Sequence, residues 1–188
     1  MITIIRLCRS RYSPKDATGA KRYGGRWNSP GHEVLYASST LALACLEVLV
    51  HIRDVGLIPT DYVYCEVEVP EVLVTPWKLT GEAALGKIES PVLSREYGDA
   101  WVAATELKAS PSQVEGYLDL SQGVFGESRE NLANEIEKIT PVQAVPSVII
   151  PREMNYLISP AHPEFDRLAW GEPQLFRFDP RLIGSTAE

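Results

Sequence analysis

The sequence predicts an α+β fold in which a mixed or antiparallel central sheet packs around one buried helix. Short segments rich in β-branched residues are spread over the whole chain of 188 residues, whereas a helical apolar pattern is clear at residues 41–53. Apolar residues make up 45% of the chain and charged residues 23%, as in soluble globular proteins. The length fits a single domain over residues 1–188 with a sizeable core.

The N-terminal part is expected to contain two short strands. Residues 2–5 are a β-branched run that predicts the first strand, and the polar residues 9–21 are expected to form a loop. Adjacent glycines and a Ser-Pro-Gly turn in residues 24–31 leave a short extended piece that carries Arg26. Residues 34–37 are predicted to be the second strand.

A buried helix is predicted at residues 41–53. Residues 38–40 are Ser, Ser and Thr, which are favoured as N-caps, and Gly56 and Pro59 are expected to end the helix. Apolar side chains cover nearly its whole circumference, and only Glu47 interrupts them between residues 41 and 50. A helix that is apolar all round is usually enclosed by the protein.

Four further strands follow from alternation or apolar runs. Residues 61–70 alternate between apolar and polar side chains, which is typical of a half-buried strand. Residues 142–150 are apolar but contain Pro146, which predicts an edge position or a bulge there. Residues 155–158 and 175–178 are two more short strand candidates.

The segments between these strands are less regular. Residues 71–100 are mixed, with a helix start expected at Ser94 or Asp99. Residues 110–140 are polar and acidic, and we expect an inserted surface excursion there with one helix over residues 130–138.

The charge balance excludes some classes of protein. With 25 acidic and 18 basic side chains the formal net charge is −7, which argues against affinity for nucleic-acid phosphates or an anionic membrane surface. The longest apolar stretch, residues 34–52, contains Glu47 and His51 and is not expected to cross a membrane. The first residues lack the pattern of a secretory signal, so we expect a cytoplasmic protein without membrane contact.

No metal or nucleotide motif is present in the sequence. The cysteines, Cys8, Cys45 and Cys65, are odd in number and lack CxxC spacing, which predicts reduced thiols. The three histidines are dispersed, so no metal site is expected. Neither a GxGxxG nor a GxxxxGK[ST] pattern occurs.

Glu47 is the most unusual residue of the sequence, because burial of a carboxylate is costly unless the group is paired or hydrogen-bonded. One interpretation is an ion pair with His51, one turn later, or with an arginine. The other is a carboxylate that the helix holds against a cavity, where it takes part in chemistry. The residues alone leave both interpretations open.

Three other residues have a functional interpretation beside a structural one. Arg26 follows two glycines and could present its planar fork to a phosphate, or it could be a surface arginine. Tyr36, just before the helix, is a candidate ligand contact or a half-buried core tyrosine. Ser147 follows Pro146 and could present its hydroxyl from a kinked strand, or be an ordinary strand serine without the GxSxG pattern of hydrolases.

Together these segments resemble the RES-domain family, which is named for its Arg, Glu and Ser. The resemblance is carried by GGRWNSPG, LYAS, LALACLEVLVH and VPSVIIPREMNYLISPAHP, at residues 24–31, 35–38, 41–51 and 145–163. It extends to the ending FRFDPRL. Two features depart from the family pattern: some thirty extra residues before the Val-Pro-Ser segment, and Ser-Pro-Ala-His where the family has Asn-Pro-x-His.

The resemblance implies a fold similar to ADP-ribosyltransferase toxins and an activity that destroys NAD⁺. The reaction would be hydrolysis or phosphorolysis of the nicotinamide–ribose bond, with water and phosphate both open as acceptors and NAD⁺ as substrate rather than cofactor. The implied catalytic residues are Arg26, Tyr36, Glu47 and Ser147. The implied substrate-binding residues are Arg6, Arg26, Asn28 and Tyr36.

These residue types suit the implied chemistry. Glu47 would stabilise an oxocarbenium-like state, as carboxylates do in glycoside hydrolysis. Arg26, together with Arg6, would bind the pyrophosphate. Tyr36 would stack on or hydrogen-bond the nicotinamide riboside, and Ser147 would hydrogen-bond the substrate or orient Glu47.

The resemblance also implies a partner and leaves alternatives. The partner would be a cognate Xre-family antitoxin that blocks the pocket and supplies all contacts with DNA; a homodimer is compatible with the sequence. A second enzymatic interpretation is ADP-ribosyl transfer to a macromolecular target. A third is a non-catalytic module that only binds an antitoxin or a nucleotide. An RNA-cleaving toxin is disfavoured by the net charge and by the lack of clustered His and Lys.

Overall fold

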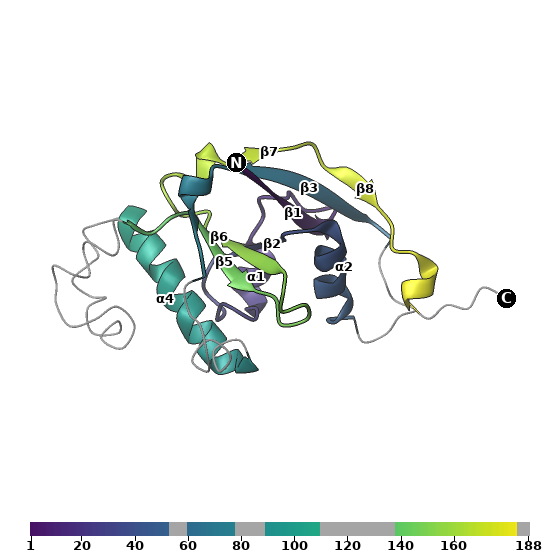
Figure 1. Cartoon of the computed structure of the whole chain (residues 1–188), viewed down its shortest axis with the longest axis horizontal. Helices are drawn as coiled ribbons and strands as arrows, with labels where there is room; N and C mark the ends of the chain where they lie inside the picture. The colour runs from purple at the N-terminus through teal and green to yellow at the C-terminus, as the bar shows by residue number, and fades with distance from the viewer. Residues whose placement is uncertain (53–59, 78–88, 110–137, 184–188) are drawn as a thin grey trace.

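The computed structural model describes residues 1–52, 60–77, 89–109 and 138–183, and its centre is an eight-stranded mixed sheet (Figure 1). The strand order is β4-β5-β6-β2-β1-β3-β7, and β8 also pairs with β3. All pairs are antiparallel except β4 with β5. The strands are β1 (Ile2–Arg9), β2 (Leu35–Ser38), β3 (Tyr62–Val69), β4 (Val74–Thr75), β5 (Val142–Pro146), β6 (Met154–Ile158), β7 (Ala169–Trp170) and β8 (Gln174–Phe176). The α+β class predicted from the sequence is confirmed.

The central ladder of the sheet joins β1 and β3 over eight residue pairs, from Ile2 opposite Val69 to Arg9 opposite Tyr62. The alternation predicted for β3 is present, since every second residue from Val63 to Val69 is buried. One face of this strand therefore belongs to the core and the other is more exposed.

Helix α2 (Leu41–Leu49) begins where the sequence predicts, because Oγ1 of Thr40 accepts a hydrogen bond of 3.1 Å from the backbone N–H of Leu43. It ends at residue 49 rather than 53, and residues 53–59 lie outside the described residues. The helix is less enclosed than its apolar sequence predicts. Its fully buried residues are Leu43 and Ala44, and the remaining side chains are partly or fully exposed, because one flank faces a cavity described below.

Helix α4 (Pro91–Ala109) starts earlier than either predicted position. Ser90 precedes it, and its Oγ accepts a hydrogen bond from the N–H of Leu93. The buried face of α4 contains Gly98, where an added Cβ would lie 1.7 Å from the carbonyl oxygen of Trp27. A glycine is therefore required for the helix backbone to touch the segment that carries Trp27.

Helix α1 (Thr18–Tyr23) lies where the sequence predicted a loop. It is six residues long and none of them is buried, so it leaves no apolar periodicity in the sequence. Three 3₁₀ turns, η2 (Glu71–Leu73), η4 (Phe165–Arg167) and η5 (Pro180–Ile183), complete the described structure.

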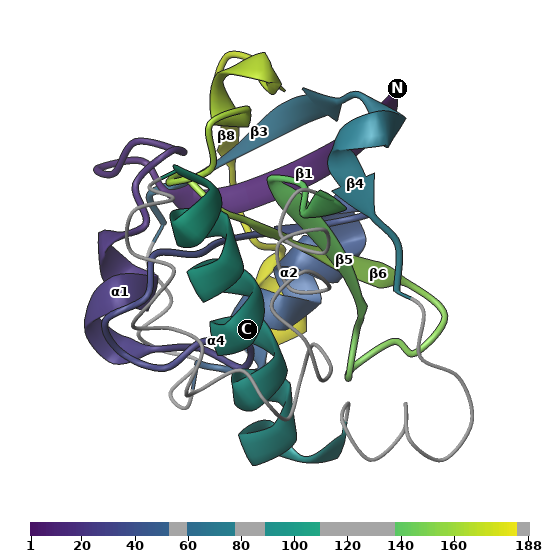
Figure 2. The ribbon, with the colours of Figure 1, turned by 90° about the vertical axis from the view of Figure 1, so that its left-hand side faces the viewer.

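The two longer helices lie on opposite sides of the molecule, with strands between them (Figures 1 and 2). On the α2 side, Ala44 packs with Ile5 and Leu7 of β1 and with Phe178. On the α4 side the buried cluster consists of Trp27, Val34, Trp101, Val102, Val145 and Leu157.

No helix in the described part of the chain is both long and apolar enough to span a membrane.

The edge position predicted for Pro146 is confirmed. Strand β4 has only two residues and pairs with Val142 and Gln143, so within the described residues it stops short of Pro146. Pro146 is paired with Met154 of β6 on the other side. Its missing N–H therefore leaves no gap in a ladder.

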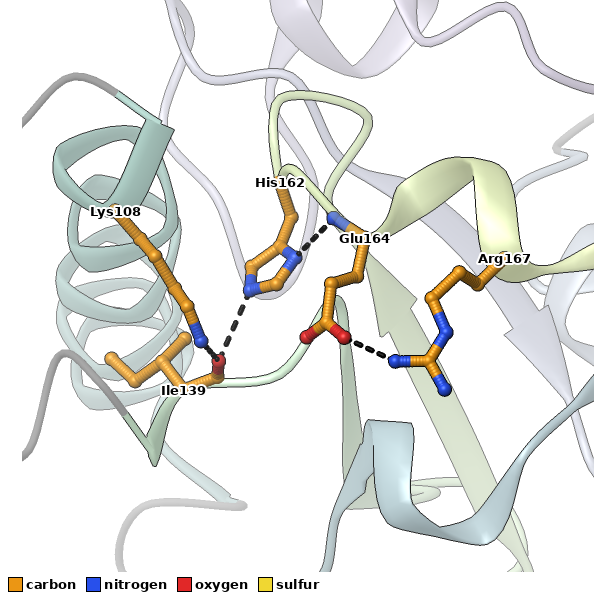
Figure 3. Close-up of polar contacts among 5 residues, drawn as sticks. All are labelled: Lys108, Ile139, His162, Glu164 and Arg167. Carbon is orange, nitrogen blue, oxygen red and sulfur yellow. Dashed lines mark hydrogen bonds and ion pairs between the residues drawn. The ribbon is translucent and has the colours of Figure 1, made fainter.

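The polar insertion falls mostly outside the described residues, which resume at residue 138, and so does its predicted helix at residues 130–138. The residues that flank the insertion are joined (Figure 3). Lys108 Nζ donates a hydrogen bond of 2.9 Å to the carbonyl of Ile139, and Nε2 of buried His162 lies 3.0 Å from the same oxygen. The chain therefore leaves and re-enters the fold at one place.

Candidate active site

A cavity of about 780 Å³ is bounded by β1, β2, α1, one flank of α2 and residues 148–149. Four of the six predicted site residues line it: Arg6, Arg26, Tyr36 and Glu47. The other two, Asn28 and Ser147, lie behind its wall and hydrogen-bond to Tyr36 and Glu47, respectively. The structure thus brings together all six residues, which come from segments far apart in the sequence.

Glu47 is half-buried on α2 and is held through one of its two oxygens. Oε1 accepts a hydrogen bond of 2.9 Å from Ser147 Oγ and one of 2.5 Å from Asn155 Nδ2. Among the described residues, no histidine or arginine lies within ion-pair distance of this carboxylate, so the interpretation as a pair with His51 or an arginine is wrong. The burial of Glu47 is compensated by neutral donors.

Ser147 is fully buried and its hydroxyl is fully used by the protein. The hydroxyl donates to Glu47 and accepts hydrogen bonds of 3.1 Å from the N–H groups of Ile149 and Ile150. Because a hydroxyl has one proton and two acceptor sites, no capacity remains for a substrate. Of the two predicted roles of Ser147, this geometry supports the orientation of Glu47.

Asn155 and Ser38 belong to the site although sequence reasoning missed both. They lie opposite each other on β6 and β2, and Ser38 Oγ donates a hydrogen bond of 2.7 Å to Asn155 Oδ1. Both are buried, at 4% exposure for Ser38 and 9% for Asn155. The available signal was a pair of polar residues in otherwise apolar strands, which require hydrogen-bond partners when buried.

Tyr36 is anchored through its hydroxyl. The hydroxyl donates a hydrogen bond of 2.6 Å to Asn28 Oδ1 and accepts one of 3.2 Å from the N–H of Trp27. Burial raises the pKa of Tyr36 far above its ordinary value of 10, so the hydroxyl keeps its proton. Gly25 is required beside it, since an added Cβ would lie 2.5 Å from the Tyr36 oxygen.

Asn28 holds the segment before β2 in place. Its side chain is fully buried, and Nδ2 lies 3.0 to 3.2 Å from the carbonyls of Ala20, Ser29 and His32. With Oδ1 occupied by Tyr36, the amide is engaged on both ends. This position supports a positioning role for Asn28 rather than the direct substrate contact expected from the sequence.

Arg6 projects from β1 and lines the cavity. Its guanidinium donates to the backbone carbonyls of Tyr36 at 2.8 Å, Pro14 at 3.0 Å and Asp16 at 3.3 Å. Burial lowers the pKa of Arg6 below its ordinary value, but an arginine stays charged in proteins. Within the described residues no carboxylate forms an ion pair with it, and its charge is balanced by these carbonyl dipoles and by the more distant carboxylate of Asp16.

Arg26 is supplied by the turn that follows α1. Gly24 has a φ of 72°, a left-handed conformation that favours glycine, and it starts this turn. Arg26 lines the cavity, and its Nη2 donates a hydrogen bond of 3.1 Å to the carbonyl of Glu89.

The part of the chain that the structure describes holds no group of three or more acidic, His or Cys side chains that could bind a metal ion.

The cavity lining is more basic than the protein as a whole. Its charged side chains are three arginines, Arg6, Arg22 and Arg26, and two carboxylates, Asp16 and Glu47. The arginines can attract an anionic ligand despite the net charge of −7.

Comparison with known families decides what kind of protein carries this arrangement. Residues 3–118 match the RES domain. The chain belongs to the RES-domain family. Of the site residues of this RES-domain chain, Arg6, Arg26, Tyr36 and Glu47 lie within the match, and Ser147 and Asn155 lie beyond it.

Similar proteins extend the relationship over most of the RES-domain chain. It is 33% identical to a Prs ADP-ribosylating toxin of a Sphingobium species, over 88% of this chain and 84% of that protein. It is 28% identical to a Toxin Res of Yersinia enterocolitica, over 95% of this chain and 98% of that protein. The recognition of a RES-domain toxin family from the sequence is confirmed.

A solved structure shows the same fold. The crystal structure of the M. tuberculosis MbcT-MbcA toxin–antitoxin complex contains a chain that aligns with a TM-score of 0.51 at 15% identity. The alignment covers 97% of the RES-domain chain and 86% of that chain.

Proposed function

We propose that this RES-domain chain is the toxin of a toxin–antitoxin pair and that it cleaves the nicotinamide–ribose bond of NAD⁺. The observation that carries the proposal is Glu47, a carboxylate held by Ser147 and Asn155 at the wall of a cavity that three arginines also line. The cavity volume of about 780 Å³ is in the range of small-molecule sites.

The cleavage step needs what Glu47 offers. When the bond between ribose C1′ and the nicotinamide nitrogen breaks, its electron pair leaves with nicotinamide, which becomes neutral. Positive charge then develops on the ribose, and a fixed carboxylate stabilises it. The reaction is completed when water or phosphate adds to C1′ and loses a proton.

The arginines suit the remainder of the substrate. NAD⁺ carries a pyrophosphate, for which the planar forks of Arg26 and Arg6 are suitable donors. Tyr36, whose hydroxyl is engaged by the protein, is left with its ring as the surface for the nicotinamide riboside.

Purified protein incubated with NAD⁺ tests the proposal. With and without phosphate, NMR should show release of nicotinamide and identify the second product as ADP-ribose or its 1-phosphate. Glu47→Gln should reduce the rate at least about 100-fold, the usual effect of removing one preorganised electrostatic group. Its thermal unfolding should stay close to that of the wild type. Near-wild-type turnover by the folded variant contradicts the assignment.

A second candidate function is transfer of ADP-ribose to a protein. It uses the same bond cleavage with a protein side chain as acceptor, and the name of the Sphingobium relative, an ADP-ribosylating toxin, favours it. Cell extract incubated with labelled NAD⁺ separates the two candidates. Label that becomes attached to a protein, detected by mass spectrometry, indicates transfer; label found only in small products indicates hydrolysis or phosphorolysis.

An antitoxin partner is part of the proposal. The structural neighbour was solved as a toxin–antitoxin complex, and this acidic chain is poorly suited to bind DNA itself. We expect overexpression to stop growth and lower cellular NAD⁺, and co-expression with an Xre-type neighbouring gene product to restore both. Growth arrest with an unchanged NAD⁺ pool would show that toxicity has another cause.

A further inference from the structure

The two oxygens of the Glu47 carboxylate have different surroundings. Oε1 accepts both hydrogen bonds, from Ser147 and from Asn155. In the described part of the chain, Oε2 accepts none, and the residue lines the cavity. One oxygen is therefore anchored to the protein and the other is available to a ligand.

The orientation of the Asn155 amide follows from the chemistry of its neighbours. An ionised carboxylate only accepts hydrogen bonds, so the NH₂ end of the amide must face Glu47. The carbonyl end then faces Ser38, which must donate its proton. Ser38, Asn155 and Glu47 thus form one directional chain of hydrogen bonds across β2, β6 and α2.

This chain restricts the position of the carboxylate. Two donors on the same oxygen oppose rotation about the last side-chain bond of Glu47, and hydrogen bonds to an ionised group are stronger than those between neutral groups. The restraint matters in a reaction that requires negative charge at a fixed place.

We propose that Asn155, oriented by Ser38, is a positioning residue that holds Glu47 with Oε2 directed at the reacting ribose. The proposal rests on the proposed function for the identity of the ligand. It adds a residue that acts through Glu47 and is distinct from the four catalytic residues implied by the family resemblance.

Three variants and one control test it in the NAD⁺ cleavage assay. Asn155→Ala should lower kcat roughly 10- to 100-fold, the range expected for a charge-assisted hydrogen bond, while KM changes less than about twofold. Ser38→Ala should act in the same direction with a smaller effect, because the amide loses its orienting donor but stays in place. Ser159→Ala is the matched control: it removes a buried hydrogen bond of 2.7 Å to Thr105 away from the cavity, so kcat should be unchanged.

Asn155→Asp separates positioning from packing. Aspartate has the shape of asparagine, so a packing role predicts that this variant is the most active of the set. A positioning role predicts the reverse, because a second carboxylate 2.5 Å from Glu47 would force the two groups to share a proton. Activity of Asn155→Asp above that of Asn155→Ala at neutral pH would overturn the proposal.

A readout independent of catalysis keeps the proposal separate from the proposed function. The ¹³C chemical shift of the Glu47 carboxylate, measured in the full chain without NAD⁺, reports the hydrogen bonds that the carboxylate accepts. It should change in Asn155→Ala and in Ser38→Ala, and should stay the same in Ser159→Ala. None of these variants alters the charged and titratable side chains that line the cavity: Arg6, Cys8, Tyr12, Asp16, Arg22, Tyr23, Arg26, Tyr36, Glu47 and His51.

The two readouts give distinct results. If the wild-type chain does not cleave NAD⁺, the proposed function fails, and the chemical shift still tests the contact between Asn155 and Glu47. If NAD⁺ is cleaved but the chemical shift of the Glu47 carboxylate is the same in wild type and both variants, or if the loss lies in KM, the positioning role is overturned. Should Asn155→Ala fail to fold, Ser38→Ala carries the same test.

Discussion

The hydroxyl of Ser147 donates a hydrogen bond of 2.9 Å to Oε1 of Glu47, although 100 residues of chain separate the two. The same hydroxyl accepts the N–H groups of Ile149 and Ile150 and so closes the turn after β5. Ser147 therefore fixes the carboxylate and the turn at once.

Ser147→Ala should consequently damage both activity and stability. Loss of a donor to the carboxylate should reduce NAD⁺ cleavage at least about tenfold, and loss of the acceptor for the N–H groups of the half-buried Ile149 and Ile150 should cost about 0.5–1.5 kcal/mol each. Thermal unfolding and the cleavage assay measure the two effects. A variant with wild-type activity, whatever its stability, would show that Ser147 does not act on Glu47.

Arg26→Lys should weaken NAD⁺ binding roughly 10- to 100-fold, because an ammonium group cannot replace a planar pair of donors to a phosphate. Titration calorimetry in the Glu47→Gln background avoids consumption of the substrate. Equal affinity with Arg26 and with Lys would mean that Arg26 does not contact the pyrophosphate.

Gly98→Ala should destabilise the fold by about 2 kcal/mol or more, because its Cβ would lie 1.7 Å from the Trp27 carbonyl and the backbone must move. Activity should fall as well, since the displaced segment carries Arg26. Gly19→Ala is the stability control: a Cβ there meets nothing within 4 Å, and alanine is favoured over glycine in a helix such as α1. Equal melting temperatures for both variants would argue against the close approach of α4.

The stability of the fold should depend on pH through His162. Its Nδ1 accepts from the Glu164 N–H, and burial, with Lys108 nearby, lowers the pKa of His162 below 6.5 (Figure 3). His162 therefore binds a proton more readily in the unfolded chain than in the folded one. The stability that neutral His162 contributes to the fold is fully present above about pH 6.5 and is lost as the pH falls through the lowered pKa. Melting temperatures between about pH 7.5 and 5.5 should fall more steeply for the wild type than for His162→Gln. Equal slopes would exclude His162 as the source.

The elements predicted best were those whose signal lies within one segment. The N-cap predicted among residues 38–40 and the alternation predicted for residues 61–70 depend on neighbouring residues, and both were confirmed, with Thr40 as the cap and Tyr62–Val69 as the strand. The start of Pro91–Ala109 was missed although Ser90 and Pro91 carry a known N-terminal signal. The end of α2 was placed too late because its apolar residues continue beyond residue 49.

Of the residues gathered at the site, Asn155 and Ser38 are the ones that the sequence did not indicate. Glu47 is conspicuous in an apolar helix, and a family pattern drew attention to the arginines and Ser147. Asn155 and Ser38 look like ordinary polar residues in strands, because their partners are brought close only by the pairing of β2 with β6. Such contacts depend on tertiary structure, which a local pattern does not contain.

The separation of Glu47 from its anchors has a consequence for the synthesis of the protein. A ribosome makes the carboxylate in the first third of the chain, whereas Ser147 and Asn155 follow 100 and 108 residues later. A nascent or truncated chain that ends before residue 147 therefore carries the carboxylate without either donor. For a protein proposed to consume NAD⁺, we expect a fragment that ends before residue 147 to cleave NAD⁺ poorly, because its carboxylate is not held in place.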